Sequence, residues 1–322
     1  MALYHLKEGT ILISLLPLEE QKKFVCAKVN GRIRELTFPI SQEGDYEIEF
    51  LDLKSPEGAR IYSSSIRYLA AMAFKIVSPK MEIRFFYNIS RAIFGKAVSS
   101  KKDIIEPELI SKVKAVMEEL IRRDIPFQRI RMSKEEALKE YKRLGLKDKI
   151  DVLKFRKENY VHLYEAKYDS LSYCDYLYSG LVPSSGYLTR FKINPYAPGF
   201  LIQVPRSELN GEIPSFLDER KFATALQESS LWEESNHLDT VSNINRFIKN
   251  YSALSLINIS EARVNDMLAS LGNRISSSKS DIRLICIAGP SSSGKTSFAN
   301  RLMYELMSRG LRPIIISFLK AN

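Results

Sequence analysis

The sequence predicts a multidomain α+β protein whose last segment begins a parallel α/β domain. Short apolar runs separated by turn residues fill residues 1–60, and amphipathic helices alternate with strands over residues 61–215. Helical patterns then dominate residues 216–280. Such patterns are typical of a helical connector that ends in a linker. In residues 281–322 a buried-type strand, a helix and a second buried-type strand follow one another, which is the opening unit of a parallel sheet. We therefore expect these four segments to be separate domains or connectors, the last of them an incomplete domain.

The first segment is expected to be a small, mostly β unit. Apolar runs at 11–16 and 24–29 predict strands, and residues 46–51 alternate apolar with acidic side chains as a half-buried strand does. The pair Asn30-Gly31 is a strong signal for a hairpin turn, because both residue types accept a positive φ.

The second segment is expected to combine helices with an antiparallel sheet. A helix is predicted at 62–77, and another begins at Pro107, since proline suits the first turn of a helix. Ser133 and Glu136 form a capping box for a third helix, which should stop near Gly145. Strands are predicted at 81–86, 92–98, 160–163, 187–193 and 200–204.

The connector is expected to end in a helix that stops at Gly272, because glycine is favoured just after helix C-termini. Residues 273–280 are rich in serine and lack an apolar period, which indicates a linker. Beyond them, residues 284–288 and 313–318 predict buried strands on either side of a helix at 295–309.

Composition fits a globular protein without a membrane segment or a secretory leader. Hydrophobic residues make up 45% of the 322 residues, and no apolar stretch approaches the ~20 residues that a membrane helix requires. The three cysteines lie far apart, which fits a reducing cytoplasm, and Cys286 is expected to be a small core residue. The net charge of +10 is weak support for a phosphate-bearing partner, because 48 basic residues are mixed with 38 acidic ones. We expect a cytoplasmic protein without membrane contact, and we leave weak RNA binding and oligomerisation open.

Residues 289–297 carry the strongest chemical signal, the pattern G-x-x-x-x-G-K-[ST] between a predicted strand and a predicted helix. Gly289 and Gly294 allow the backbone to approach a phosphate closely, and the following N–H groups can surround it at the positive end of the helix. A chance match inside a Gly/Ser-rich loop is the alternative, and the flanking strand and helix patterns argue against it. The predicted cofactor-binding residues are Gly289, Pro290, Ser291, Ser292, Ser293, Gly294, Lys295, Thr296 and Ser297.

Two residues of this phosphate loop have predicted chemical roles. Lys295 is the predicted catalytic residue, because its ammonium group can reach the β- and γ-phosphates. The Thr296 hydroxyl is placed to bind Mg²⁺, so ATP and Mg²⁺ are the predicted cofactors.

The loop by itself does not make a complete active site. Phosphoryl transfer also needs an acidic residue for the metal, a group that positions the nucleophile, and further cations. The chain stops at Asn322, four residues after the second predicted strand ends at Phe318. We therefore expect a truncated piece of a longer enzyme that does not turn over alone.

Other residues of chemical interest have simpler explanations. The histidines His5, His162 and His237 lack a second histidine or cysteine at ligand spacing, and we expect them to be surface or packing residues. A set of tyrosines could stack nucleic-acid bases, although a half-buried strand surface is the favoured explanation. These tyrosines are Tyr164, Tyr168, Tyr173, Tyr176 and Tyr178.

The front of the chain resembles threonyl-tRNA synthetases. The run Ala27-Lys-Val-Asn-Gly-Arg-Ile-Arg-Glu-Leu, followed by Glu47-Ile-Glu-Phe-Leu and Glu57-Gly, is similar to their TGS domain, which implies a β-grasp-like fold for residues 1–60. Residues 61–205 are similar to their editing-type domain, which implies an α+β fold for the second segment.

The resemblance does not extend to the metal ligands of that editing domain. The family carries two histidines four apart on a helix and, later, Asp-x-Cys-x-x-x-His. Here the helical positions fall on Ser64 and Tyr68, or one residue earlier, and the later positions fall on Leu177 and Leu181. All four ligand types are absent, so neither metal binding nor tRNA editing is expected.

The whole chain resembles bacterial nucleoside kinases that fuse such a front to a uridine kinase/phosphoribulokinase-type domain. Three segments carry this resemblance: Gly180-Leu-Val-Pro-Ser-Ser-Gly-Tyr-Leu, Pro198-Gly-Phe-Leu-Ile-Gln-Val-Pro and Ala288-Gly-Pro-Ser-Ser-Ser-Gly-Lys-Thr. It implies ATP/Mg²⁺-dependent phosphorylation of a nucleoside, with uridine as the leading substrate, at its 5′-hydroxyl. The sequence departs from this family after Ser317, where its substrate-handling Asp segment has no counterpart. The rival prediction is a synthetase-derived RNA- or tRNA-binding or regulatory module without catalysis.

Overall fold

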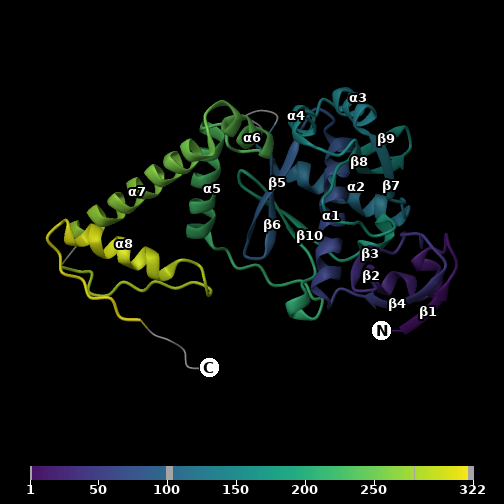
Figure 1. The fold of residues 1–322 in the computed structure, drawn as a ribbon, viewed down its shortest axis with the longest axis horizontal. Coiled ribbons are helices and arrows are strands. Elements are labelled where there is room, and N and C mark those ends of the chain that lie inside the picture. Colours follow the sequence, from purple (N-terminus) through teal and green to yellow (C-terminus); the bar gives the residue numbers. More distant parts are fainter. Residues whose placement is uncertain (1, 99–103, 279, 318–322) are drawn as a thin grey trace. The chain divides into compact units, whose positions relative to one another are not determined.

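The computed structural model describes residues 2–98, 104–278 and 280–317. The chain divides into two compact units, Met1–Ser235 and Asn236–Asn322. The first unit combines three antiparallel sheets with helices, and the regular structure of the second, over its described residues, is helical (Figure 1). The expected α+β class is confirmed, whereas the finer segment boundaries at residues 60, 215 and 280 stay predictions.

The first sheet contains four strands in the order β1-β4-β2-β3. Strand β2 (Cys26–Val29) turns into β3 (Arg32–Glu35) through Asn30 and Gly31, whose φ values are 47° and 76°. The predicted hairpin is therefore confirmed. The other strands of this sheet are β1 (Ala2–Leu6) and β4 (Gly44–Leu51).

The strand predicted at 11–16 is wrong. Residues Leu12–Leu15 form a 3₁₀ helix, η1, and a second one, η2, covers Gln21–Lys23. Leu12 is fully buried while Ile11 is 43% exposed, so the apolar run inserts one side chain into the core instead of extending along the sheet. A short apolar run does not distinguish these outcomes by itself.

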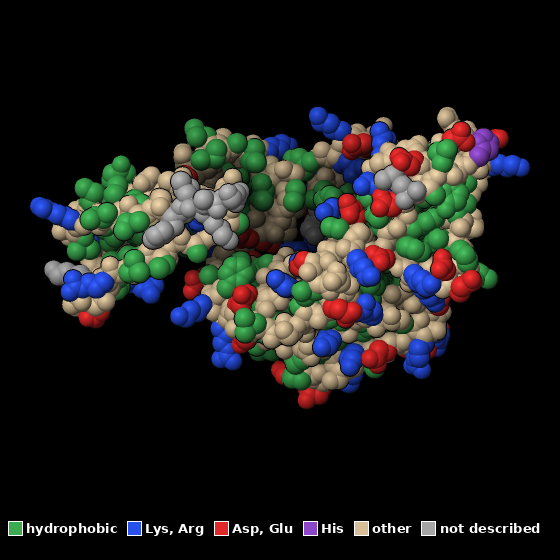
Figure 2. All heavy atoms as spheres, turned by 90° about the horizontal axis from the view of Figure 1, so that it is seen from below, with side chains coloured by type: hydrophobic (Ala, Val, Ile, Leu, Met, Phe, Trp, Pro, Cys, Tyr) green, Lys and Arg blue, Asp and Glu red, His purple; other side chains and the backbone are tan. Residues whose placement is uncertain are grey.

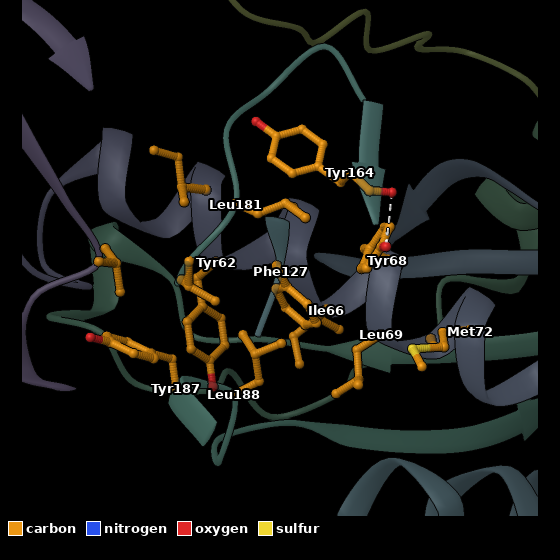
Figure 3. Packing of buried hydrophobic residues seen from close by; sticks show 14 of the residues in the cluster. Tyr62, Ile66, Tyr68, Leu69, Met72, Phe127, Tyr164, Leu181, Tyr187 and Leu188 are labelled. Carbon is orange, nitrogen blue, oxygen red and sulfur yellow. Dashed lines mark hydrogen bonds between the residues drawn. The ribbon is translucent and has the colours of Figure 1, made fainter. Parts of the chain in front are cut away.

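Helix α1 (Pro56–Val77) runs through the main core of the first unit. It begins six residues before the predicted start, because Ser55 caps it by accepting a hydrogen bond from the Gly58 N–H at 3.0 Å. Figure 3 shows Ile66 and Leu69 of this helix packed in the same cluster as Phe127. Helix α2 (Pro107–Arg122), predicted from Pro107, packs against α1.

The second sheet has the order β10-β11-β6-β5, with all neighbours antiparallel. Its strands are β5 (Ile83–Ile89), β6 (Ala92–Ala97), β10 (Lys192–Tyr196) and β11 (Gly199–Gln203). Helix α5 (Arg220–Ser235) is tied to it by an ion pair of 2.7 Å between Lys96 and Glu234.

The strand predicted at 187–193 is wrong for most of its length. Residues Ser185–Tyr187 form the 3₁₀ helix η3, and the strand begins only at Lys192. The Ser185 hydroxyl donates to the Leu120 carbonyl at 2.6 Å and accepts from the Ile125 N–H at 2.7 Å. These long-range hydrogen bonds hold the segment in a turn, and no local pattern encodes them. A further 3₁₀ turn, η4, follows at Ser207–Leu209.

The third sheet has the order β7-β8-β9 and is covered by two helices. It consists of β7 (Gln128–Ser133), β8 (Tyr160–Tyr168) and β9 (Leu171–Asp175), with α3 (Lys134–Leu144) and α4 (Lys147–Phe155). The capping box of Ser133 and Glu136 is present, with hydrogen bonds of 2.8 and 3.2 Å, and Gly145 ends α3 at φ 73°. Both predictions are confirmed.

The second unit contains α6 (Val241–Asn250), α7 (Ala253–Ser277) and α8 (Lys295–Met307). Helix α7 does not stop at Gly272, and the predicted linker is helical as far as Ser277. A Cβ atom at Gly272 would lie 2.8 Å from Cγ of Glu305 in α8, so this glycine permits close helix packing and does not end α7. The two helices lie side by side (Figure 1) around Leu268, Ile275, Leu302 and Leu306.

The predicted parallel α/β start is not confirmed. Residues 284–288 and 313–317 form no strand, and Leu284 and Ile314 are 78% and 87% exposed. Cys286, predicted to be a core residue, is exposed as well. A buried parallel strand needs ladder partners and covering helices on both faces, and the described part of this unit supplies neither. Phe318, the predicted last strand residue, lies outside the described residues.

Surface character also differs along the chain. On the face drawn in Figure 2, basic and acidic side chains are interspersed, and hydrophobic side chains gather over the α7–α8 unit. Within the described ranges, no helix combines the length and the apolar character that crossing a bilayer requires.

Gly58→Ala is expected to destabilise the first unit. A Cβ atom there would lie 2.0 Å from the Asp52 carbonyl oxygen, a backbone atom that cannot swing aside. We expect the free energy of unfolding in urea to fall by roughly 1–3 kcal/mol. Gly44→Ala, where the nearest atom is 4.0 Å away, is the matched control and should change it by less than about 0.5 kcal/mol. Equal effects of the two substitutions would contradict the tight packing at Gly58.

Candidate functional site

A cavity of about 200 Å³ lies where the first sheet meets the third. Strand β3 contributes Arg34 and Glu35, and the third sheet contributes Arg129, His162 and Tyr164. Residues 177–180, which follow β9, line the remaining side. Segments from distant parts of the sequence therefore build this pocket, which we call the Glu35 cavity.

The Glu35 carboxylate organises this cavity. Its side chain is 9% exposed, and Oε1 accepts hydrogen bonds from the Tyr164 hydroxyl at 2.5 Å and the Leu181 N–H at 2.8 Å. The Arg129 guanidinium lies 3.6 Å from Oε2. Burial and the adjacent carboxylate raise the pKa of Tyr164, which keeps its hydroxyl a neutral donor. A Cβ atom at Gly180 would lie 2.7 Å from Cγ of Glu35, so only glycine fits there without rearrangement.

One side of the third sheet is both cationic and aromatic. Arg129 and Arg131 alternate onto the same side of β7, and their partners across the ladder are Tyr164 and His162. Arg131 also lies over the Tyr160 ring, with 4.1 Å between Cζ and the ring centroid. We call these five residues the cationic face. Both arginines are exposed. The Arg129 guanidinium lies 3.6 Å from the Glu35 carboxylate, whereas Arg131 extends its charge toward a partner.

The charge of this face comes from the arginines. Partial burial lowers the pKa of His162, and the nearby charges of Arg129, Arg131 and Arg156 lower it further. The imidazole is therefore neutral near pH 7 and presents a flat ring with hydrogen-bonding nitrogens. Guanidinium groups beside aromatic rings suit a partner that carries phosphates and bases.

The sequence did not identify the cationic face. His162 was expected only as a surface or packing residue, whereas the structure places it on the cavity wall. Tyr164 is buried in the core while Tyr178 is 86% exposed, so the tyrosines do not form one uniform strand surface. The alternation of arginine at 129 and 131 is a period-2 signal that could have indicated one half of this face.

The positions of the synthetase metal ligands are filled by other chemistry. The Tyr68 hydroxyl lies 3.0 and 3.1 Å from the carbonyl oxygens of Tyr164 and Tyr173 and shares its one proton between them; Figure 3 draws the hydrogen bond to Tyr164. Leu177 lines the cavity and Leu181 is buried. The alternative helical positions, Ser63 and Arg67, bond to each other at 3.1 Å. These side chains do not fit a metal ion, and no cluster of potential ligands occurs among the described residues.

The phosphate loop lies in the second unit. Ser292 and Gly294 adopt left-handed conformations, with φ values of 59° and 81°, and α8 begins at the next residue. A Cβ atom at Gly289 would lie 2.8 Å from Oγ of Ser293, so the loop is folded tightly on itself. The Lys295 ammonium donates to the Pro290 carbonyl at 2.5 Å, which brings it back over the loop.

The nine predicted loop residues thus occupy one turn and the start of one helix. Thr296 and Ser297 belong to the first turn of α8, whose leading N–H groups have no intrahelical acceptor. Residues 291–294 are exposed. No contact recorded here tests the roles predicted for Lys295 and Thr296, and they stay predictions.

Comparison with known proteins identifies relatives of part of the chain. The threonine–tRNA ligase of Carboxydothermus hydrogenoformans is 26% identical over 172 residues, which cover 53% of this chain and 26% of that protein. The ligase of Aquifex aeolicus is 29% identical over 201 residues, covering 59% and 29%, and that of Desulforamulus reducens is 26% identical over 179 residues, covering 56% and 27%. No protein-family model matches.

About half of the chain resembles threonyl-tRNA synthetases. The chain spans little more than a quarter of the length of the curated relatives it matches. The predicted resemblance of part of the chain to these synthetases is confirmed at this level. A uridine kinase domain receives no support from the comparisons.

The prediction of a nucleoside kinase of the uridine kinase type is wrong. The predicted kinase and transferase classes and the predicted nucleoside substrate are therefore rejected as well. The relatives are ligases that act on tRNA, as their names state. The kinase prediction depended on a phosphate loop and on resemblance in three segments, residues 180–188, 198–205 and 288–296. Such a loop indicates phosphate binding but does not identify a reaction or an acceptor.

The pKa values of the two histidines of the first unit are expected to shift in opposite directions from their ordinary value. Hydrogen bonds and charge from Asp45 and Glu43 raise the pKa of His5, whereas burial and three arginines lower that of His162. A lowered pKa means that His162 favours the folded state when neutral, so its contribution is lost as pH falls below 6.5. NMR titration of the imidazole protons should place His162 below 6.5 and His5 above it, with His162→Gln assigning the signal. Coincident titrations would contradict the cationic surroundings of His162.

Proposed function

We propose that this chain is a non-catalytic module of synthetase descent that binds RNA, with tRNA as its leading partner. The observation that best supports RNA binding is the cationic face beside the Glu35 cavity. This face lies in the same unit as the hairpin that resembles a synthetase TGS domain. The curated relatives act on tRNA by name. A cytoplasmic location would follow from such a partner.

The chemistry of this face favours binding over catalysis. Exposed arginines can neutralise phosphates, and Tyr160 and His162 offer rings on which bases can stack. The positions of the family's editing ligands carry Tyr68, Leu177 and Leu181, none of which can activate water on a metal ion. We infer that the Glu35 cavity retains a binding role without hydrolysis. A regulatory role is the alternative form of this proposal.

We further propose that the phosphate loop binds the polyphosphate of ATP, with Mg²⁺ held through Thr296. The tight turn at Ser292 and Gly294, followed by an α8 N-terminus, supports anion binding by N–H groups. Lys295 lies over this loop and could exchange its Pro290 contact for a phosphate oxygen. This proposal concerns ligand binding and includes no transfer reaction.

Replacing Arg131 by glutamine, alone and together with Arg129→Gln, is expected to weaken tRNA binding. The double variant should bind tRNA about ten-fold or more weakly. The slope of log K against log[salt] should become shallower by roughly 1–2, because each arginine that contacts a phosphate releases counterions. Fluorescence anisotropy with labelled tRNA at several salt concentrations measures both quantities.

The matched control for this experiment is Arg220→Gln. Arg220 is 87% exposed and pairs with Asp218, which accepts a hydrogen bond from Tyr196 of the second sheet, whereas the cationic face is on the third. Its removal should leave affinity within about two-fold. Unchanged affinity and salt slope in the double variant would show that RNA does not bind through the cationic face.

Lys295→Ala is expected to weaken binding of ATP–Mg²⁺ by roughly ten-fold to a hundred-fold, the range of a lost charge-assisted hydrogen bond. Isothermal titration calorimetry on the chain measures this, and circular dichroism should show unchanged helix content. Arg312→Gln, at an exposed residue of the same unit, is the control. If Lys295→Ala and the unsubstituted chain bound ATP equally well, the phosphate loop would not be the nucleotide site. That result would not bear on RNA binding by the first unit.

A further inference from the structure

A second cavity, of about 270 Å³, lies in the first unit between α1 and the segment that follows β11. Three arginines line it: Arg60 and Arg67 from α1, and Arg206 from the segment after β11. The hydroxyl residues Ser63 and Ser207 lie on the same walls. We call this the Arg67 cavity. It shares no lining residue with the Glu35 cavity.

The charges of the Arg67 cavity are not balanced. Glu208 is the one carboxylate on its wall, and it pairs with Arg206 at 3.0 Å. Among the described ranges, no carboxylate forms an ion pair with Arg60 or Arg67. Three arginines against one glutamate leave two positive charges in excess.

Arg67 is the most informative of these residues. Its guanidinium is partly buried, and burial lowers its pKa below the usual value without any carboxylate to offset the effect. One of its nitrogens donates to the Ser63 hydroxyl at 3.1 Å. A guanidinium carries five N–H donors, so most of its hydrogen-bonding capacity remains for a ligand. Burying a cation without a counter-charge is costly, and a bound anion would remove that cost.

Helix geometry brings these groups together. Positions 60, 63 and 67 recur at the three- and four-residue spacing of a single helix face, so Arg60, Ser63 and Arg67 lie in one row along α1. Arg206 approaches from the opposite wall, where its backbone N–H bonds to the Glu212 carbonyl at 3.0 Å. The donors therefore face a common space from two elements that the fold holds in place.

We propose that Arg60, Arg67 and Arg206 bind the phosphate group of a small phosphorylated molecule in the Arg67 cavity. Arginine side chains recognise phosphate by paired, charge-assisted hydrogen bonds, and serine hydroxyls supply further donors. The volume is several times the ~30 Å³ that a water molecule occupies in the liquid, so a phosphate with a small attached group fits. No aromatic side chain among the described residues lines this cavity, so a base would find no ring to stack on, which favours a small phosphorylated molecule over a nucleic-acid strand. The site is independent of the proposed RNA binding.

Isothermal titration calorimetry on the chain with inorganic phosphate and with ribose 5-phosphate tests this proposal at constant ionic strength. Both ligands should bind to the unsubstituted chain. Arg67→Met keeps the apolar length of the side chain and removes its charge, and it should lower affinity at least ten-fold. Arg206→Gln, at the cavity wall, should give a loss in the same direction and guards against misfolding of the Arg67 variant. If ribose 5-phosphate bound more tightly than inorganic phosphate, the ligand would be identified as an organic phosphate. If the two bound equally, the ligand would be identified as free phosphate.

Arg122→Gln is the control, because Arg122 is 74% exposed and pairs with Glu119 on α2. It should bind both ligands as the unsubstituted chain does. Absence of binding to the unsubstituted chain, or equal affinities in the Arg67, Arg206 and Arg122 variants, would overturn the proposal. A heat signal reproduced by sodium chloride alone would overturn it as well.

Discussion

The carboxylate of Glu35 is the interaction on which the candidate RNA surface depends. It lies at the end of a short strand in the first sheet, yet both hydrogen bonds to its Oε1 come from the third sheet and the segment after it, more than a hundred residues later in the chain. A buried carboxylate is costly unless its lone pairs are satisfied. The Tyr164 hydroxyl, the Leu181 N–H and Arg129 satisfy them here, and in doing so fix the relative position of β3 and β7.

The positions at which the resemblance to synthetases implies metal ligands carry structural side chains in this chain. Where the family places ligands, this chain places a tyrosine that bonds to two backbone carbonyls and leucines that are buried or line the cavity. Burial raises the pKa of Tyr68, so its hydroxyl remains neutral and acts as a structural donor.

Local sequence signals predicted local structure well. The Asn30-Gly31 hairpin, the Ser133 capping box and the helix that begins at Pro107 each depend on residues close in sequence, and all three are present. Local signals failed where contacts with distant segments decide the structure. Gly272 lies inside α7, where it lets α8 pack closely. Residues 284–288 have an apolar pattern but no strand partners among the described residues.

The candidate site divides in the same way. The phosphate loop is a contiguous motif and could be found by its spacing, although spacing did not reveal which protein class it belongs to. The cationic face could not be assembled from sequence, because Arg129 and Arg131 meet His162 and Tyr164 only through strand register. The Arg67 cavity likewise requires α1 to meet a segment about 140 residues later, and residues 60, 63 and 67 alone suggest only a polar helix face.

Photochemical crosslinking of bound tRNA, followed by mass spectrometry of the crosslinked peptides, tests RNA binding most directly. Binding through the cationic face predicts adducts on Tyr160 of β8 and on the exposed Tyr178, which lines the adjacent Glu35 cavity. Crosslinks confined to α5 through α8, or the absence of any crosslink at concentrations where anisotropy reports a complex, would contradict it.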